Sequence, residues 1–423
     1  MPHASHSPKS PLLVVLGAGS RTYRGYGLQH IAARYPVALL DEAPPAWAEE
    51  HVALSRAVDL TDGQAVREAV EMLAAERGVA GVLTYIENHV VLAARVAGHF
   101  GLPGTTPASV DACRDKYLSR SLLAAAGVPS ARSYLVADVD TAVEYAQLLG
   151  GPVVLKPRSL AGSAGVQRAD TPEQVRAAFQ TARGAGLFGL ERASTSGVLI
   201  EEYLEGPEVS VECVVLGHGT MHIAAITRKY LSDEPFFQET GHLVDGADPL
   251  LADPQIRAVA QAALEAVGIS SGVMHVEMRL TREGPRIIEL NARLGGDLIP
   301  HLVLLATGLN LPQITADLAV GADPELVPSH SQSAAVRFLF ADISGHVTAV
   351  NTGVFAPWLD RFEWTAAPGS HVTAPPHATL HDRTALAVVT GAGPDICHQR
   401  LHLVEQRSGI HIQPDTTTNA CVA

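Results

Sequence analysis

The sequence predicts a multidomain protein of mixed α/β and α+β architecture, and three observations support this prediction. Its 423 residues exceed what one compact core accommodates, so about two to four domains are expected. Residues 11 to about 105 alternate short apolar runs with amphipathic, alanine-rich stretches, as parallel α/β units do. From Gly197 onward, apolar runs follow one another closely and favour antiparallel strands.

Composition and charge argue against several classes of function. Apolar residues make up 47% and charged residues 17% of the chain, as in an ordinary folded soluble protein. The net charge of -14 leaves no surplus of Lys and Arg, which argues against binding nucleic acid or an anionic membrane. The four cysteines form no CxxC pair and suit a reducing compartment. No apolar run reaches membrane-spanning length or forms a signal core, so a cytoplasmic location is expected.

The first predicted domain is a small α/β unit at residues 11–105, preceded by a disordered segment at 1–10. Three apolar runs, PLLVVLGAG, YPVALLD and GVAGVLTYI, are expected to be buried parallel strands separated by helices. The turn GAGSRT at 17–22 begins like the dinucleotide-binding GxGxxG motif but lacks its third glycine. A tight turn from strand to helix is therefore favoured over a dinucleotide site.

The rest of the chain divides into a large central domain, a C-terminal domain at 326–413 and a tail at 414–423. The C-terminal domain mixes strands such as AAVRFLF with one helix. The central domain is expected to contain, in order, a helix at 109–126, a strand–helix–strand–loop–helix unit at 133–183, strands at 197–204, 208–216 and 222–230, a helix at 254–267 and a hairpin at 272–293.

The loop KPRSLAGSAGV, residues 156–166, inverts the order of a P-loop, in which the lysine follows the glycines. Lys156 ends the apolar run PVVLK, and a lysine in a buried strand is costly unless it meets an anion. The small residues that follow would let backbone N–H groups approach phosphate oxygens. A basic residue beside a flexible turn is the alternative.

The hairpin at 272–293 brings two acids together. A five-residue turn would pair Leu280 with Arg286, and counting back along the strands places Glu277 opposite Glu289. Like charges directly opposed across strands destabilise a sheet. The two carboxylates therefore require a counter-charge.

The remainder of the hairpin alternates, with apolar side chains including Ile288 on one face and polar side chains on the other. Two carboxylates flanked by Asn291 form an oxygen-ligand set that suits Mg²⁺. The alternative is an exposed face on which Arg279 and Arg293 neutralise the acids. The upstream loop favours the metal site, because phosphates bound there would share the same cation.

Five segments, in this order, resemble the signature of the ATP-grasp carboxylate–amine ligases. They cover roughly residues 105–312 and are Lys116, VVLKPRSLAGSAGV, LIEEYLEGPEVSVE, HVEMRL and IIELNARLGGD. The resemblance implies an ATP-grasp domain at 106–325 with a lid at about 133–203, between a Rossmann-like N-terminal domain and a mixed α+β C-terminal domain. A biotin-linked carboxylation role is disfavoured, because the sequence lacks the consecutive glycines and the MKM tripeptide of biotin carboxylases.

The resemblance also implies how the chain binds ATP and Mg²⁺, with Mn²⁺ as a substitute. Two lysines would contact the phosphates, small residues of the loop would close over them, the segment after the next strand would bond adenine, and an acid would grip the ribose. The implied ATP-binding residues are Lys116, Lys156, Ser163, Gly165, Glu201, Glu202, Leu204 and Glu208. The implied metal ligands are Glu277, Glu289 and Asn291. Without the resemblance, Lys116 is more simply an exposed helix lysine, and Glu208 fits a solvated turn equally well.

A second substrate site follows from the same resemblance. Within the superfamily the likeness is greatest to the L-amino-acid ligases that form dipeptides, whose substrate loop resembles FFQETGH at 236–242. Glu239 and His242 would face the amino acid, and Asp297 would favour a cationic group of the substrate. Arg293 would stabilise an acyl phosphate and the tetrahedral oxyanion. His242 is the candidate base for the amine, and a structural loop with a satisfied histidine is the alternative.

The expected function is an ATP-dependent ligase that activates an amino-acid carboxylate as an acyl phosphate. An amine, expected to be a second amino acid, would then displace phosphate to form an amide. The alternatives are a ligase for another small carboxylate of nucleotide or intermediary metabolism, a non-catalytic ATP-binding protein, and a nucleotide-dependent oxidoreductase. The GxSxG match at 268–272 follows a helix and precedes a strand, the reverse of a hydrolase elbow. Small-molecule substrates and a homodimer are expected.

Overall fold

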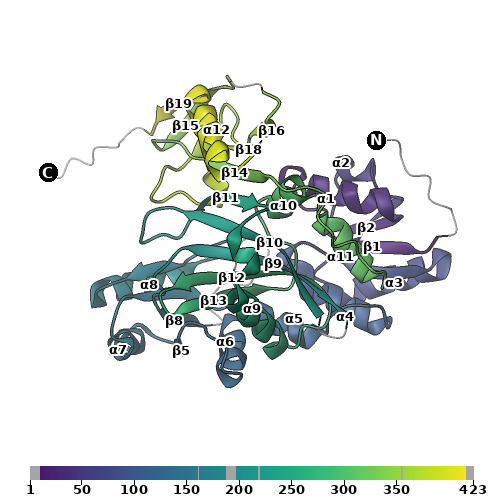
Figure 1. Cartoon of the computed structure of the whole chain (residues 1–423), viewed down its shortest axis with the longest axis horizontal. Helices are drawn as coiled ribbons and strands as arrows, with labels where there is room; N and C mark the ends of the chain where they lie inside the picture. Colours follow the sequence, from purple (N-terminus) through teal and green to yellow (C-terminus); the bar gives the residue numbers. More distant parts are fainter. Residues whose placement is uncertain (1–9, 161, 187–196, 218–219, 354–355, 416–423) are drawn as a thin grey trace.

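The structure is a computed structural model that describes residues 10–160, 162–186, 197–217, 220–353 and 356–415. Most of the predicted disordered N-terminus, most of the predicted tail and Ala161 of the loop lie outside these residues. A central sheet lies between an N-terminal α/β unit and a smaller lid, and the C-terminal part covers one end of it (Figure 1).

The N-terminal unit has a parallel four-stranded sheet in the order β3-β2-β1-β4. Its strands are β1 (Leu12–Leu16), β2 (Val37–Asp41), β3 (Leu54–Ala57) and β4 (Val79–Leu83). Its longer helices are α1 (Arg21–Arg34), α3 (Gly63–Arg77) and α4 (Val90–His99). The three predicted strands are confirmed as parallel. β1 is buried at every position, as expected for a strand covered on both faces.

The glycine-containing turn between β1 and α1 is tight, as predicted. Gly17 and Gly19 have φ angles of 79° and 69°, in the left-handed region that favours glycine. A Cβ atom at Gly19 would lie 2.7 Å from Ile86 Cδ1 and 3.0 Å from Arg24 Cγ. The missing side chain therefore lets the turn lie directly against the segment after β4 and against Arg24.

The helix predicted at 109–126 is wrong in one respect, because the chain forms two helices, α5 (Pro107–Arg114) and α6 (Lys116–Ala125). Asp115 between them has extended backbone, and its Oδ1 accepts hydrogen bonds from the Tyr117 and Leu118 N–H groups at 3.1 Å each. An aspartate in this geometry caps the N-terminus of a new helix. The break makes Lys116 the first residue of α6.

The lid carries its own antiparallel sheet in the order β5-β8-β6-β7, with two helices packed on one face. Its elements are β5 (Ser133–Val136), α7 (Val139–Leu149), β6 (Val153–Pro157), β7 (Gln167–Ala169), α8 (Pro172–Gly184) and β8 (Val198–Glu202). The strand–helix–strand–loop–helix prediction is confirmed over this region. The loop after Lys156 joins β6 to β7.

The central sheet has eight strands in the order β13-β12-β9-β10-β11-β14-β18-β16. They are β9 (Glu208–Leu216), β10 (Thr220–Leu231), β11 (Glu239–Asp245), β12 (Gly272–Thr281), β13 (Gly284–Asn291), β14 (Ser333–Leu339), β16 (Leu359–Trp364) and β18 (Ala385–Gly391). β11 pairs with β14, so the sheet runs without a break across the predicted domain boundary at 325.

The hairpin register is correct at the acids but wrong at the turn. Glu277 lies opposite Glu289 as predicted, whereas Leu280 pairs with Pro285 and not with Arg286. A bulge restores the register, because two residues of β13 oppose one position of β12. Ile288 is the extra residue, and it lines a cavity instead of joining the core as predicted, while Ile287 is fully buried.

The remaining elements surround the central sheet. α9 (Pro254–Ala266) packs with α6 over one face, and α10 (Ile299–Thr307) and α11 (Leu311–Ala319) pack toward the N-terminal unit. The helix predicted near the C-terminus is present as α12 (Pro394–Arg407), beside a small sheet of β15 (Gly345–Asn351), β17 (His371–Val372) and β19 (Gly409–Pro414). Over the described ranges no single helix meets the length and hydropathy of a membrane span, although α10 and α11 do together, across a bend of 106°.

Candidate active site

A cavity lies between the lid sheet and the central sheet, with about 910 Å³ of space including the solvent at its open mouth. We call it the first cavity. It gathers most of the predicted site residues, namely Lys116, Lys156, Ser163, Glu201, Glu202, Leu204, Glu208, Glu239, Glu277, Glu289, Asn291 and Arg293. Gly165 does not line this cavity. A Cβ there would lie 2.5 Å from Ala185 Cβ, so this glycine permits close packing inside the lid.

Lys156 meets the anion that its burial requires, and that anion belongs to the protein. Its Nζ lies 2.6 Å from Glu201 Oε2, and the other oxygen of Glu201 accepts a 2.8 Å hydrogen bond from Arg120 Nε. All three side chains are buried. Burial alone would raise the pKa of Glu201, but Arg120 and Lys156 bring it below its ordinary value. Glu201 thus fixes the lysine at the cavity wall through its side chain.

Lys116 reaches the same cavity from the N-terminus of α6. Its Nζ donates to the Leu160 carbonyl and lies 3.2 Å from Glu289 Oε1. Arg158 pairs with the capping residue Asp115 and so fixes the helix start to the end of β6. The lysine is buried, which contradicts the simple interpretation of an exposed helix lysine.

The segment from the end of β8 to Leu204 is held by ion pairs and packing. Glu202 accepts hydrogen bonds from Arg132 Nε at 2.7 Å and from Arg286 Nη1 at 3.0 Å. Leu204 is buried at the cavity wall. These contacts fix the backbone of the segment and leave it facing the cavity.

Lys229 on β10 is the site residue that the sequence analysis missed most conspicuously. Its Nζ lies 2.9 Å from Glu208, 2.6 Å from Glu239 and 2.9 Å from Glu277. Burial would lower its pKa, but the three carboxylates raise it well above the ordinary value. The spacing of the three acids could suit a metal, yet the ammonium group already lies among them.

The three predicted metal ligands fit a hard divalent cation. In the described part of the chain, Glu289 makes a single ion pair, with Lys116, and Asn291 Oδ1 accepts only a 3.5 Å hydrogen bond from Arg293. Oxygen atoms therefore remain available at Glu289 and Asn291, beside Glu277. Such a set of two carboxylates and one amide oxygen matches the preference of Mg²⁺.

The carboxylate of Glu277 is oriented by contact with a buried histidine, His275. His275 Nε2 lies 3.1 Å from Glu277 Oε1, and His275 Nδ1 lies 2.9 Å from Glu212 Oε1. Glu212 also accepts hydrogen bonds from Ser210 and Thr227. Burial opposes a charged imidazole, but Glu212 and Glu277 raise the pKa of His275 to about 10.

Arg293 lies where the first cavity meets a second one. Its Nε donates to Glu87, a residue of the N-terminal unit that the sequence analysis did not identify. Glu87 also lies 3.3 Å from Arg114 Nε. Burial favours a neutral Glu87, yet Arg293 and Arg114 lower its pKa below the ordinary value. The guanidinium is thus oriented by another domain.

The second cavity, of about 590 Å³, shares a wall with the first. The shared residues are Gly162, Glu239, Glu277 and Arg293. Asp297 lines the second cavity as well, with a left-handed φ of 48°. Such backbone in a residue other than glycine costs about 1–3 kcal/mol and persists where surrounding contacts enforce it.

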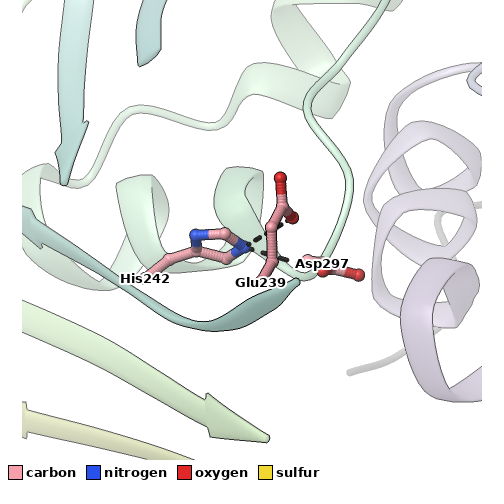
Figure 2. A group of neighbouring side chains, drawn as sticks. All are labelled: Glu239, His242 and Asp297. Carbon is pink, nitrogen blue, oxygen red and sulfur yellow. Dashed lines mark ion pairs between the residues drawn. The ribbon is translucent and has the colours of Figure 1, made fainter. Parts of the chain in front are cut away.

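His242 does not line either cavity, so it is not placed as the base that was predicted. Its Nε2 lies 3.4 Å from Glu239 Oε2 and 3.6 Å from Asp297 Oδ2, between the two acids (Figure 2). The imidazole is fully buried. Burial would lower its pKa, but Asp297 and Glu239 raise it above the ordinary value.

The C-terminal part completes the second cavity with Leu380 and Arg383. Arg383 donates from Nη1 and Nη2 to the two oxygens of Asp297, at 2.8 and 2.6 Å, and its guanidinium lies 3.6 Å from the centre of the Phe338 ring. A Cβ at Gly162 would lie 2.9 Å from Leu380 Cδ2. The lid loop therefore approaches the C-terminal wall directly.

Comparisons with known proteins agree with this architecture. Residues 149–301 match the ATP-grasp domain family, and residues 37–104 match the ATP-grasp N-terminal domain family. An uncharacterized protein, y4rH of Sinorhizobium fredii, is 30% identical over 331 residues, which are 77% of this chain and 67% of that protein. Phosphoribosylamine–glycine ligase of Streptomyces coelicolor is 29% identical over 410 residues, covering 92% of this chain and 93% of that protein.

Carnosine synthase 1 of Homo sapiens is 28% identical over 345 residues, although the match spans 40% of that longer protein and 74% of this chain. Among solved structures, an L-amino acid ligase from Bacillus licheniformis superposes with a TM-score of 0.77 at 21% identity, covering 96% of this chain and 100% of that one. The matched domains, the relatives and the shared fold together show that the chain belongs to the ATP-grasp superfamily of carboxylate–amine ligases.

Proposed function

We propose that the protein joins the carboxylate of one amino acid to the amine of a second, using ATP and releasing ADP and phosphate. The observation that carries this proposal is the wall common to the two cavities, where Arg293 and Glu277 face both. A nucleotide in the first cavity and a carboxylate in the second would meet at this wall, as phosphoryl transfer requires. The relatives named as carnosine synthase and L-amino acid ligase support amino-acid substrates.

In this proposal the first cavity binds ATP. Lys116 and Lys156 contact the phosphates, and the lid loop around Ser163 closes over them and excludes water. Adenine lies against the segment from Glu202 to Leu204, and Glu208 is within reach of the ribose. Glu201 acts by fixing Lys156, a more indirect role than the sequence suggested.

Glu277, Glu289 and Asn291 would hold Mg²⁺ or Mn²⁺, which when bound neutralises phosphate charge. Arg293, oriented by Glu87, would bind the carboxylate that is activated and later its tetrahedral oxyanion. Both roles require the side chains to be held in position before the substrates arrive.

The reaction proceeds in two displacements. A carboxylate oxygen attacks the γ-phosphorus and ADP leaves, which converts a poor electrophile into an acyl phosphate. The amine nitrogen then attacks the acyl carbon, the carbon–oxygen bond to phosphate breaks, and the departing phosphate accepts the proton from nitrogen. His242 is assigned a positioning role for Glu239 and Asp297, because its ring nitrogens are buried beside them.

A ligase for another small acid is the alternative, supported by the phosphoribosylamine–glycine ligase relative. A non-catalytic ATP-binding protein is disfavoured, since every lysine and carboxylate of the motif is present. We further propose that the protein works in the cytoplasm as a homodimer on small molecules.

The test is phosphate release from Mg²⁺-ATP across a matrix of paired amino acids, with mass spectrometry of each positive well. Release that requires both amino acids, with a product lighter than their sum by one water, is expected. Release with glycine and phosphoribosylamine alone would establish the alternative. Nucleotide binding without release in any well would refute a ligase of amino acids.

A further inference from the structure

Arg24 on α1 lies beside the second cavity, in a part of the N-terminal unit that the proposed function does not use. Its Nη1 donates a 3.0 Å hydrogen bond to the Gly295 carbonyl, and its guanidinium lies 5.7 Å from the centre of the Tyr85 ring. Gly295 lies two residues after Arg293 and directly before Gly296, and both of these residues line the second cavity. The side chain keeps partial access to solvent.

Among the cations in or beside the two cavities, Arg24 differs in making no ion pair with an acid of the described residues. Each of the others is paired within the described chain: Lys116 with Glu289, Lys156 with Glu201, Lys229 with three acids, Arg279 with Glu208, Arg293 with Glu87 and Arg383 with Asp297. Arg24 makes one hydrogen bond among those residues, although a guanidinium carries five N–H donors.

The surroundings of Arg24 make this lack of a partner costly. Burial lowers its pKa, and the neighbouring Arg293 lowers it further because two like charges repel; Tyr26, Tyr85 and Asp297 raise it, but the net shift is downward. An uncompensated, largely desolvated cation destabilises a protein unless an anion joins it. Gly19 supplies the room for the side chain, since a Cβ there would lie 3.0 Å from Arg24 Cγ. Arg24 is thus a cation near Arg293 that makes no ion pair within the described chain.

We propose that Arg24 binds the carboxylate of the amine substrate, so that this substrate is an amino acid or another amine that carries a carboxylate. This inference rests on the proposed function. Arg293 would hold the acyl group, and an α-amino acid bears its amine on the carbon next to its own carboxylate. A cation beside Arg293 would thus hold the second substrate with its nitrogen near the acyl carbon.

The experiment compares wild type, Arg24→Gln and Arg24→Lys, with Arg21→Gln as control, because Arg21 is exposed on the same helix. The amine substrate identified by the matrix is offered as the free acid or as its primary amide. Hydroxylamine, which has no carboxylate, traps the acyl phosphate as a hydroxamate. Thermal unfolding of each variant reports whether it folds.

Arg24→Gln should raise the KM for the free acid roughly 10- to 100-fold, the loss of a charge-assisted contact. The KM for ATP and the rate of hydroxamate formation should change less than about twofold. For the wild-type protein, the KM for the primary amide should exceed the KM for the free acid by a similar factor. This measurement needs no variant. The KM of Arg24→Lys for the free acid should lie between those of the wild type and Arg24→Gln.

Three results would overturn the inference. An unchanged KM in Arg24→Gln would exclude the contact, and an equal effect on acid and amide would exclude recognition of the carboxylate. If hydroxamate formation fell as much as amide formation with the free acid, Arg24 would contact the activated carboxylate substrate and not the amine substrate. If the wild type forms neither a ligation product nor a hydroxamate, the proposed function itself fails. This outcome is distinct from the other three.

Discussion

The two cavities share a wall, but the chain builds them in different ways. All residues that line the first cavity lie between Lys116 and Arg293. The second cavity adds Leu380 and Arg383 from the C-terminal part, and Arg24 of the N-terminal unit lies beside it. Under the proposed function, nucleotide chemistry would be contained in one domain, whereas substrate recognition would depend on three. Changes outside the central domain should therefore alter substrate choice before they alter ATP use.

The largest effect is expected at Lys229, because its partners Glu239 and Glu277 line both cavities and its loss should disturb both. Replacing Lys229 with Met removes the buried ammonium group that Glu208, Glu239 and Glu277 share, although Glu208 keeps Arg279 and Glu277 keeps His275. Removing one partner of a buried ion pair costs about 3–5 kcal/mol. We expect a loss of that order in the free energy of unfolding, measured by urea denaturation. Lys229→Arg should recover part of it, and an unchanged midpoint in Lys229→Met would contradict the assigned electrostatic role.

Glu289→Ala sharpens the assignment of the first cavity. We expect ATP turnover to fall by at least about 10²- to 10³-fold while the fold is retained, because the charge of the transferring phosphoryl group loses its stabilisation. Steady-state phosphate release and circular dichroism measure the two effects. Glu283→Ala is the matched control, since Glu283 is exposed in the turn of the same hairpin. Substantial turnover with a normal Mg²⁺ dependence would remove Glu289 from the metal site.

Arg383→Met should affect the second cavity alone. Asp297 loses both hydrogen bonds that hold its left-handed backbone, so the wall beside Glu239 shifts. Loss of such a supporting contact raises KM by about tenfold. We expect this change for one amino-acid substrate and an unchanged KM for ATP. Arg337→Met, which breaks the pair between Arg337 of β14 and Glu405 of α12, is the control. An equal rise in both KM values would contradict the division between cavities.

The same division explains how much of the site could be predicted from the sequence. Lys156, Glu277 and Glu289 were predictable because strand periodicity and short-range pairing place them. Lys229 carried a similar local signal, a lysine within an apolar strand, but nothing local indicated three acids around it. Glu87, Arg24 and Arg383 come from remote segments, and only the packing of domains brings them to the cavities.

Fold prediction failed at single residues for comparable reasons. The helix break at Asp115 depends on a side-chain cap that is reinforced by Arg158, directly after β6. The bulge at Ile288 depends on tertiary contacts as well, because Arg120 donates a 2.6 Å hydrogen bond to the Ile288 carbonyl. Periodicity predicts where strands and helices lie, but such one-residue irregularities are set by partners distant in sequence.

The uninterrupted pairing of β11 with β14 limits which parts of the protein can move independently. Hinge motion of the C-terminal part would break a ladder from Gly241–Arg337 to Asp245–Ser333, whereas the lid has a separate sheet. Under the proposed function, substrate entry and product release would therefore depend on movement of the lid. A chain shortened after residue 325 would expose β11 as an unpaired edge, the kind of surface on which proteins aggregate.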